Sequence, residues 1–388
     1  MDFDVIIVGG GLVGASFALA LRAADLRIAL VDSRLPETTF DRAGWDARIY
    51  AISPGSQIFL RECGAWDRID PSRMCAVEDM QVFGDDRIAE LDFGAYAAGL
   101  RELAVILENR ELQAAIWQAV QEIAGIEIIA PAVCSSLALT PDAAELLLAD
   151  GRKLSARLVV GADGGDSWVR AQAGIEVNGR PYAQTAVVAN FSTALSHRNV
   201  ATQWFLRNGI LAFLPLPGER VSIVWSTATE HAEHLLSLNA GELAREVFDA
   251  SNGKLGDLEL ITPAAGFPLR IQRVKRLVLP RLALIGDAAH SVHPLAGQGV
   301  NLGFRDAREL ANILLNRGAQ HDCGDFALLR RYERARKEDI LSMQFTTDTL
   351  KRLFNNDNPG LSRLRNFGLK LVNRQPALKN LLVRQAVG

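Results

Sequence analysis

Residues 4–14 read DVIIVGGGLVG and residues 28–32 read IALVD, and these two stretches decide the fold. The apolar start of the first stretch is typical of a strand buried on both faces of a parallel sheet. Gly9, Gly11 and Gly14 then fall on the spacing G-x-G-x-x-G, which allows a tight turn, a close approach of backbone to a pyrophosphate, and a helix packed on the strand. Apolar residues with helical period follow, so we expect the N–H groups of a helix N-terminus to face the phosphates.

Asp32 ends the second apolar run, about 20 residues after the glycines, where a carboxylate can accept both hydroxyls of a ribose. A strand, a glycine turn, a helix, a second strand and an acid in this register favour a dinucleotide site. The alternative is a doubly wound domain with a chance glycine turn. Both interpretations predict an α/β fold.

The composition sets the outer limits. A chain of 388 residues suits two domains or one elaborated domain. A formal net charge of −3 gives no reason to expect nucleic acid as a partner. The cysteines form neither a disulfide framework nor a metal-ligand spacing; they are Cys63, Cys75, Cys134 and Cys323. No signal peptide is recognised before the first strand, and no apolar run approaches the roughly 20 residues of a spanning helix, so we expect a cytoplasmic protein.

Two polar residues between the first strands and the middle of the chain are candidate ligand contacts. Arg48 follows a polar stretch, and a guanidinium suits a pyrophosphate; a solvated surface arginine is an equally open alternative. Glu108 to Leu112 opens a second helical pattern. Asn109 either caps that helix or touches a ligand.

A second strand-to-glycine turn lies near residue 163. Residues 127–130, 133–139, 145–149 and 153–160 read as strands, with Asp150-Gly151 as a hairpin turn before the last of them. This last strand delivers Asp163 into a glycine-rich turn before a helix, where the carboxylate bonds either a ligand hydroxyl or its own turn.

Residues from about 184 to 268 are rich in short β segments and predict an antiparallel sheet inserted in the α/β domain. Large apolar side chains of this sheet are candidates for the floor of a pocket that takes an apolar substrate. Simple core packing is the alternative for each of them. They are Trp204, Phe213, Leu214, Pro215 and Trp225.

A third turn follows a buried strand that ends at Gly286-Asp287. A loop with Pro294 and two glycines comes next, and then a helix whose core face is Val300, Phe304, Ala307, Leu310 or Ala311, and Leu314. The N–H groups after Gly297 are unpaired and suit a ring edge that becomes anionic on reduction. His290 and His293 lack companions at metal-ligand spacing, so we favour structural imidazoles and expect no metal site.

These three turns together resemble the three FAD signatures of single-component flavin monooxygenases, of which para-hydroxybenzoate hydroxylase is the type. More narrowly, the segment from Gly286 to Gly299 looks like that of the ubiquinone-biosynthesis hydroxylases. Residues 108–110, 212–216 and 364–369 point the same way, whereas residues 45–53 fit that family only loosely. The resemblance covers nearly the whole chain.

The resemblance implies a Rossmann-like FAD-binding domain with an inserted antiparallel substrate domain and a C-terminal helical tail. The FAD-binding domain would comprise residues 1–75, 101–180 and 270–345. The substrate domain would comprise residues 76–100 and 181–269, and the helical tail residues 346–388.

The resemblance also implies a set of cofactor contacts. The glycines would hold the pyrophosphate, Asp32 the adenosine ribose, and the backbone after Gly297 the edge of the flavin ring, with Pro294 beside that ring. The full set is Gly9, Gly11, Leu12, Val13, Gly14, Asp32, Ser33, Arg48, Asn109, Val133, Asp163, Asp287, Gly297, Gly299, Val300 and Asn301. No side chain is assigned as a catalytic base, because the flavin carries the difficult step.

The implied reaction is hydroxylation of the aromatic ring of a polyprenylated phenol or quinol, with O₂ as oxidant and NAD(P)H as a transient reductant. Only one G-x-G-x-x-G is present, and FAD would occupy it. A hydroxylase of another aromatic, a halogenase, a prenyl reductase and a non-catalytic flavoprotein of a biosynthetic complex remain alternatives. No Trp-x-Trp-x-Ile-Pro segment of the halogenase kind is present.

The tail from residue 346 to the end is basic and amphipathic. Its charged residues are Lys351, Arg352, Arg363, Arg365, Lys370, Arg374, Lys379 and Arg384 against Asp348 and Asp357. The tail either packs on the FAD domain with a solvated basic face, or docks on an anionic membrane surface or a partner complex. In the second case the protein would be peripheral at the inner face of a membrane. The sequence also leaves a homo-oligomer open.

Overall fold

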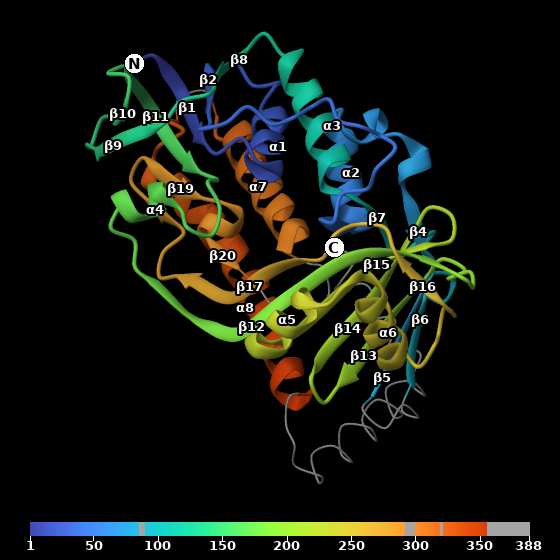
Figure 1. Ribbon diagram of the computed structural model, residues 1–388. Helices are drawn as coiled ribbons and strands as arrows, with labels where there is room; N and C mark the ends of the chain where they lie inside the picture. Colours follow the sequence, from blue (N-terminus) through green and yellow to red (C-terminus); the bar gives the residue numbers. More distant parts are fainter. Residues whose placement is uncertain (85–89, 292–298, 319–320, 355–388) are drawn as a thin grey trace.

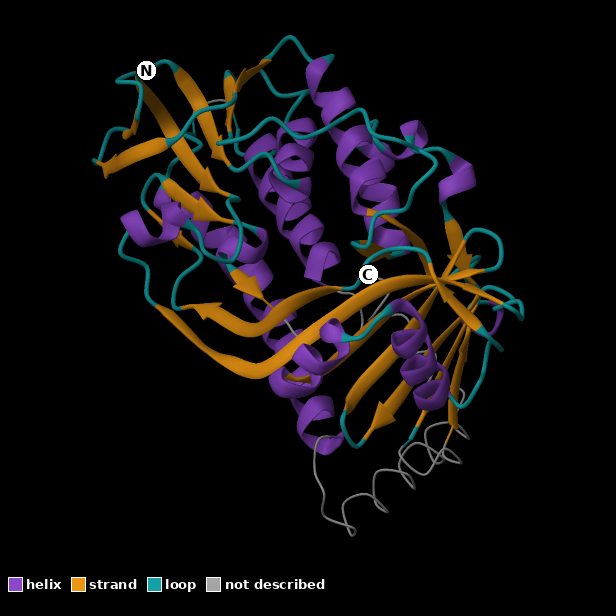
Figure 2. Cartoon of the chain, viewed as in Figure 1, coloured by secondary structure: helices purple, strands orange, loops and turns teal. Residues whose placement is uncertain are grey.

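The computed structural model describes residues 1–84, 90–291, 299–318 and 321–354 (Figure 1). It contains an α/β part built on a mostly parallel sheet and a second part built on a large, mostly antiparallel sheet (Figure 2). The α/β class and the inserted antiparallel sheet predicted from the sequence are both confirmed.

The first sheet is organised around β1, which pairs in parallel with β2 on one side and β11 on the other. Val5, Ile6 and Ile7 have no exposed surface, as expected for a strand covered on both faces. The strands in spatial order are β18 (Val278–Leu279), β19 (Leu282–Leu284), β11 (Lys153–Gly161), β1 (Phe3–Val8), β2 (Ile28–Val31) and β8 (Ile126–Ile129). The predicted hairpin is β10 (Ala144–Leu148) with β11, and β9 (Cys134–Leu139) pairs with β10.

Helices cover this sheet. Helix α1 (Leu12–Ala20) packs against both α3 (Asn109–Gln121) and α7 (Gly299–Leu315), and α7 also contacts α2 (Pro54–Glu62) and α8 (Phe326–Phe354). The predicted core face of α7 is confirmed, since Phe304, Ala307 and Leu314 are all buried. A short helix, α4 (Trp168–Gln172), follows β11.

The second sheet is covered on one face by α5 (Thr229–Ser237) and α6 (Ala240–Ser251). It joins the strands of residues 184–268 to β5 and β6, which come from the 76–100 segment of the expected substrate domain, at one end, and to β20 at the other. Its order is β20 (His290–Ser291), β17 (Ala265–Val274), β12 (Val177–Thr193), β15 (Arg220–Ala228), β14 (Gly209–Leu216), β13 (Val200–Leu206), β5 (Asp79–Phe83) and β6 (Glu90–Gly94), with β16 (Leu258–Leu260) beside β12.

The two parts are joined by long strands and by a small third sheet. Strands β12 and β17 run across the expected domain boundaries at 180/181 and 269/270, and Figure 1 shows them as long ribbons that lead from one part into the other. The small sheet has the order β3 (Ile49–Ile52), β7 (Ala104–Glu108), β4 (Cys75–Val77). The domain boundaries themselves stay a prediction.

The expected tail region is only partly described. Helix α8 includes residues 346–354, and residues 355–388 lie outside the described residues. Within the described part of the chain, no helix combines the length and the apolar character needed to cross a membrane.

Candidate cofactor site

The first glycine turn has two kinds of glycine. An added Cβ at Gly9, whose φ is +109°, would lie 2.4 Å from the carbonyl oxygen of Ala162, and one at Gly14 would lie 2.0 Å from that of Gly9. An added Cβ at Gly11 would meet nothing within 4 Å. Gly11 therefore borders open space at the N-terminus of α1, whose N-cap makes no side-chain hydrogen bond. Free N–H groups beside an open cradle fit the pyrophosphate of a dinucleotide.

Asp32 lies directly beside this turn, as the motif predicts. Its Oδ2 accepts a hydrogen bond from the N–H of Gly10 at 2.6 Å, and its Oδ1 accepts one from the N–H of Arg34 at 2.9 Å. The side chain is only partly buried, so its oxygens remain within reach of a ligand at the edge of the turn.

Two residues that hold the turn were missed from the sequence. Trp117 Nε1 and Gln113 Nε2, one helical turn apart on α3, both donate to the carbonyl oxygen of Gly10, at 2.7 and 3.1 Å. Their spacing places them on one face of a helix. Nothing in the sequence indicates that this face packs over the glycine turn.

The second turn is tied to its own helix and to the third turn. The Asp163 carboxylate accepts hydrogen bonds from Ser167 Oγ at 2.5 Å and from the N–H of Val169 at 2.9 Å. Arg170, buried in α4, donates to the carbonyl oxygen of Ala288 at 2.9 Å. Asp163 therefore bonds its own turn, one of the two roles that the sequence left open.

The start of β9 converges on the same region. Burial, followed by the charges of Asp163 and Asp32, raises the pKa of the Cys134 thiol to about 11. The neighbouring Val133 is 58% exposed. Val133 thus lies at an accessible position next to a residue that both aspartates influence; its carbonyl oxygen accepts from the N–H of Ala149 at 2.8 Å.

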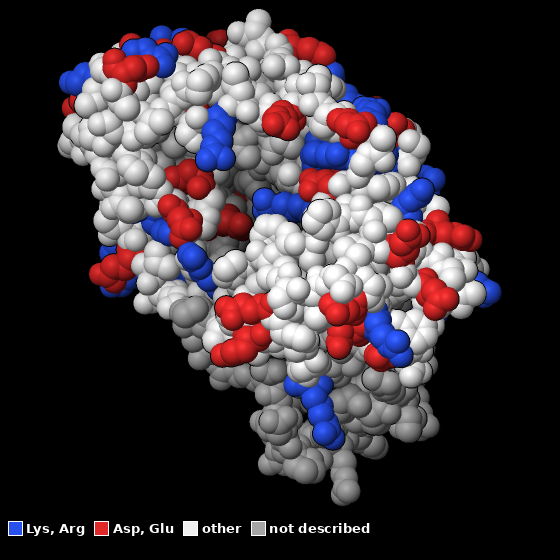
Figure 3. Space-filling view, in the orientation of Figure 1, with Lys and Arg blue, Asp and Glu red and all other residues white. Residues whose placement is uncertain are grey.

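Asp287 and Arg48 also converge. Burial raises the pKa of the Asp287 carboxyl, while the neighbouring His290 and Arg48 oppose the rise. The Asp287 side chain is nonetheless solvent-accessible. A group that is surrounded by protein yet accessible lines a recess. Figure 3 shows a hollow between the α/β part and the large sheet, with acidic and basic side chains around it.

Arg48 is linked to Asn109, because its carbonyl oxygen accepts the N–H of Asn109 at 2.8 Å. Asn109 is the first residue of α3, and Glu108 occupies the N-cap position without a side-chain cap bond. The capping role considered for Asn109 is therefore wrong. The ligand role remains a proposal.

The N-terminus of α7 is clasped to β3. The fully buried Asn301 accepts from the N–H of Ser53 at 3.0 Å and donates to the carbonyl oxygen of Ala51 at 2.8 Å. This side chain therefore fixes the first turn of α7 against the strand that follows Arg48. Val300 and Gly299 beside it are partly exposed. Pro294, Gly297 and His293 lie outside the described residues.

A buried ionic cluster supports the third turn from behind. Asp306, which has no exposed surface, accepts hydrogen bonds from the N–H of Gly286 (2.9 Å), from His290 Nε2 (2.6 Å) and from Arg336 Nε (2.7 Å). Burial alone would raise the pKa of Asp306, but His290 and Arg336 outweigh it and lower the pKa. His290 thus has the structural role favoured from the sequence. No group of three or more potential metal ligands occurs among the described residues.

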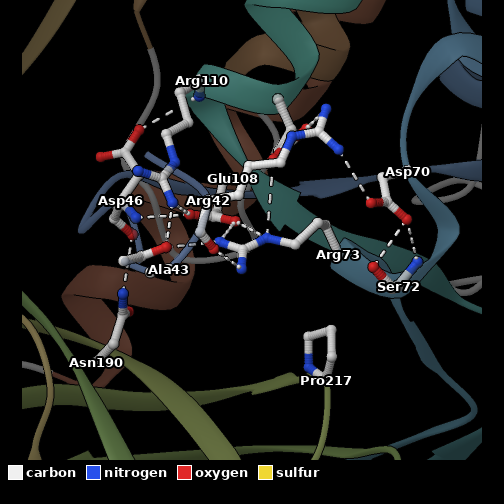
Figure 4. Close-up of polar contacts among 12 residues, drawn as sticks. Arg42, Ala43, Asp46, Asp70, Ser72, Arg73, Glu108, Arg110, Asn190 and Pro217 are labelled. Carbon is white, nitrogen blue, oxygen red and sulfur yellow. Dashed lines mark hydrogen bonds and ion pairs between the residues drawn. The ribbon is translucent and has the colours of Figure 1, made fainter. Parts of the chain in front are cut away.

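The loop of residues 42–46, here called the strap, is fastened to both parts of the molecule (Figure 4). Glu108, fully buried, accepts from the N–H of Asp46 at 2.6 Å and from Arg73 Nε at 2.8 Å. From the large sheet, Asn190 Nδ2 donates to the carbonyl oxygen of Asp46 at 2.8 Å. A cavity of about 380 Å³ lies beside the strap, between Phe40, Trp45 and Arg110 on one side and Thr262 and Pro263 on the other.

The strap also carries an aromatic contact between the two parts. The guanidinium carbon of Arg73 lies 3.7 Å from the centre of the Trp45 ring, and that of Arg220, on β15, lies 5.6 Å from it. Trp45 is therefore bracketed by one cation from each part.

The candidate substrate residues divide between the two faces of the large sheet. Trp204, Phe213 and Trp225 pack in the cluster that faces α5 and α6, together with Leu235 and Val247. Leu214 instead packs toward the small sheet. Because side chains alternate along a strand, Pro215 lies on the same side as Phe213. Trp204, Phe213 and Trp225 are therefore core residues in this structure.

Comparisons with known proteins agree with this geometry. Residues 2–343 match the FAD binding domain family. The chain is 38% identical to the ubiquinone hydroxylase UbiL of Rhodospirillum rubrum, over 99% of this chain and 89% of that protein. It is 34% identical to the 3-demethoxyubiquinol 3-hydroxylase of Escherichia coli, over 99% of this chain and 98% of that protein.

Solved structures support the same fold. That of PqsL, a probable FAD-dependent monooxygenase from Pseudomonas aeruginosa, superposes with a TM-score of 0.79 at 24% identity, over 95% of this chain and 99% of the other. At this identity the match establishes the fold alone. Together with the family match and the full-length relatives, the open glycine cradle identifies the chain as a member of the FAD binding domain family, with FAD as its cofactor.

Proposed function

We propose that the protein is an FAD-dependent monooxygenase that uses NAD(P)H and O₂ to hydroxylate the aromatic ring of a polyprenylated phenol or quinol in ubiquinone biosynthesis. The observation that carries the proposal is the convergence of three separate turns, at Gly11, Asp163 and Asp287: Gly9 approaches Ala162, Gly286 approaches Val13, and Arg170 bonds Ala288. The assignment to ubiquinone biosynthesis rests on the two relatives named above, a ubiquinone hydroxylase and a 3-demethoxyubiquinol 3-hydroxylase.

The proposed cofactor contacts follow the convergence. We assign the pyrophosphate to the N-terminus of α1, the adenosine ribose to Asp32 with Ser33, and the adenine to the backbone at Val133. The flavin half is assigned to Arg48, Asn109, Asp287 and the backbone of Gly299, Val300 and Asn301. The remaining contacts assigned to FAD are Gly9, Leu12, Val13, Gly14 and Asp163.

When bound, FAD would supply the redox chemistry of the hydroxylation, with the nicotinamide as reductant and O₂ as oxidant. The chain contributes binding, orientation and exclusion of water. The N-terminal dipoles of α1 and α7 favour negative charge on the cofactor. The Asn301 clasp and the Asp306 cluster hold the α7 turn and the Asp287 turn at fixed positions, so that little rearrangement is needed during the reaction.

The sheet face opposite α5 and α6 supports an apolar substrate. Val188, Val224 and Ala212 are cross-strand neighbours there, and each alternates with a residue of the helix-covered cluster. Phe267, next to this row on β17, is 41% exposed. These side chains carry no charge, and Arg220, four residues before Val224 on the same face of β15, lies over the Trp45 ring. An aromatic ring without an acid group, carrying a prenyl chain, matches such a face.

The experiment that tests the proposal uses the purified holoprotein with a short-chain prenylphenol, NAD(P)H and ¹⁸O₂. We expect yellow protein, nicotinamide oxidation that bleaches the flavin, and one ¹⁸O atom in the ring product by mass spectrometry. A prenyl reductase would instead give a product without ¹⁸O, and a non-catalytic flavoprotein would not be bleached. In a deletion strain, the accumulating quinone intermediate would identify the ring position.

For the tail we propose docking on an anionic membrane surface, because a polyprenylated phenol partitions into lipid and the segment is basic and amphipathic. Basic residues near such a surface contribute on the order of 1 kcal/mol each before screening. Flotation with anionic and neutral liposomes, at low and high salt, tests this with the full chain and a chain ending at residue 354. If the full chain and the shortened chain float equally poorly while both are folded and yellow, the proposal that the tail docks on a membrane is wrong.

A further inference from the structure

Tyr50 lies beside the proposed flavin contacts, although its segment, residues 45–53, was given no cofactor role at this position. It is on β3, two residues after Arg48, and Asn301 clasps the backbone of the next residue, Ala51. Ile49 and Ala51 pack toward the large sheet, whereas Tyr50 packs with the core of the α/β part, as does Val300 of α7. Strand alternation therefore turns the Tyr50 ring to the α/β side of β3, and β3 is itself in contact with α7.

Two of the charged neighbours of Tyr50, Arg48 and Asp287, are proposed cofactor contacts; the third is Asp46 of the strap. The guanidinium carbon of Arg48 lies 5.6 Å from the centre of the ring. The Asp287 carboxylate is close enough to affect the titration of the phenol. Like Asp287, the Tyr50 side chain remains partly accessible although protein surrounds it. Tyr50 and Asp287 thus lie near each other, and both remain accessible.

We propose that Tyr50 is a cofactor contact, whose ring touches the flavin half of bound FAD while Arg48 covers the ring from another side. This inference rests on the proposed cofactor arrangement and adds a residue that neither the sequence motifs nor the resemblance assigned. The phenol remains a hydrogen-bond donor at neutral pH, because burial, opposed by the charge of Arg48, raises its pKa above the ordinary value. A protonated phenol beside a flavin can both donate to a cofactor oxygen and quench the excited flavin by transient electron transfer.

The test measures the fluorescence lifetime of bound FAD and the FAD dissociation constant of the holoprotein after reversible stripping. Tyr50→Phe keeps the ring volume and removes the hydroxyl, and Tyr50→Trp restores an oxidisable ring. Tyr96→Phe is the matched control, because Tyr96 is 96% exposed. We expect Tyr50→Phe to lengthen the lifetime and to weaken FAD binding roughly fivefold, the loss of about one neutral hydrogen bond. Tyr50→Trp should keep a short lifetime.

The outcomes separate this inference from the proposed function. A lifetime in Tyr50→Phe equal to that of the wild type overturns the Tyr50 contact and leaves the proposed function standing. A lengthened lifetime in the Tyr96→Phe control as well would overturn it too, since the effect would then be unspecific. A wild-type chain that does not bind FAD overturns both.

Discussion

At the scale of single residues, the glycines of the first turn differ in how much space a side chain would find at their positions. Gly14 packs against the backbone of Gly9, so a methyl group there has no room to enter. We expect Gly14→Ala to lower the free energy of unfolding by about 3 kcal/mol, the upper range for an overpacked site. Gly11→Val should leave the fold intact but fill the cradle and remove FAD. Urea unfolding and flavin absorbance on the same preparations check both results; a yellow Gly11→Val protein would contradict the assignment.

The buried Asp306 gives a pH-dependent contribution to stability. Its folded-state pKa is lowered despite burial. The stabilisation is therefore fully present above the unfolded pKa of about 4 and is lost as the pH falls through the folded value. Asp306→Asn removes the buried anion that His290 and Arg336 share, although Arg336 keeps its ion pair with Asp339, and it should cost about 3 kcal/mol at pH 7.

The difference between wild type and Asp306→Asn should shrink when urea unfolding is repeated from pH 6 down to pH 3. Asp70→Asn is the control, because Asp70 also has a lowered pKa, through Ser72, but lies at the surface. An Asp306→Asn penalty that grows toward low pH would have the wrong sign for this mechanism.

At the scale of elements, helix α6 shows a signal that the sequence carried and our interpretation missed. Asn239 accepts from the N–H of Glu242 at 3.0 Å, and the Glu242 side chain accepts from the N–H of Asn239 at 3.0 Å, which completes a capping box. Asn239→Ala should destabilise the protein by about 1 kcal/mol. Glu242→Gln keeps an acceptor and should change little. Both are measured by denaturant unfolding, and equal losses would show that the cap is not the cause.

The elements that the sequence predicted well are those whose cause is local. The strand before Gly9, the turn itself and the face of α7 follow from period and spacing. The contacts that hold them are not local: Trp117 reaches Gly10 across 107 positions, and Asn301 reaches Ala51 across 250. The sequence could not decide whether Trp204, Phe213 and Trp225 line a pocket or pack in the core. The apolar pattern of a strand does not indicate which of its two faces a helix will cover.

At the scale of the whole molecule, the strap (residues 42–46) connects the α/β part to the large sheet, because it is hydrogen-bonded to both. Removing the charge in Glu108→Gln should weaken its bonds to Arg73 and Arg110 while keeping an acceptor for the N–H of Asp46. We expect a loss of about 3 kcal/mol for this buried site, faster tryptic cleavage at Arg42, and weaker FAD binding because the strap leads directly into Arg48. Arg101→Gln, at a side chain that is 96% exposed, is the control. Unchanged cleavage at Arg42 would argue against the strap.

The order of the first sheet has a consequence for the chain as it is synthesised. Gly161, at the end of β11, pairs with Val8 on one side and with Leu284 on the other. The nascent protein therefore cannot close this sheet until Leu284 has left the ribosome, roughly 15 to 60 seconds after initiation at ordinary elongation rates. Throughout that interval the apolar edge of β1 or β11 lacks its neighbour. Such an edge is open to wrong pairing, so the growing chain is a natural client for chaperones that bind extended apolar segments.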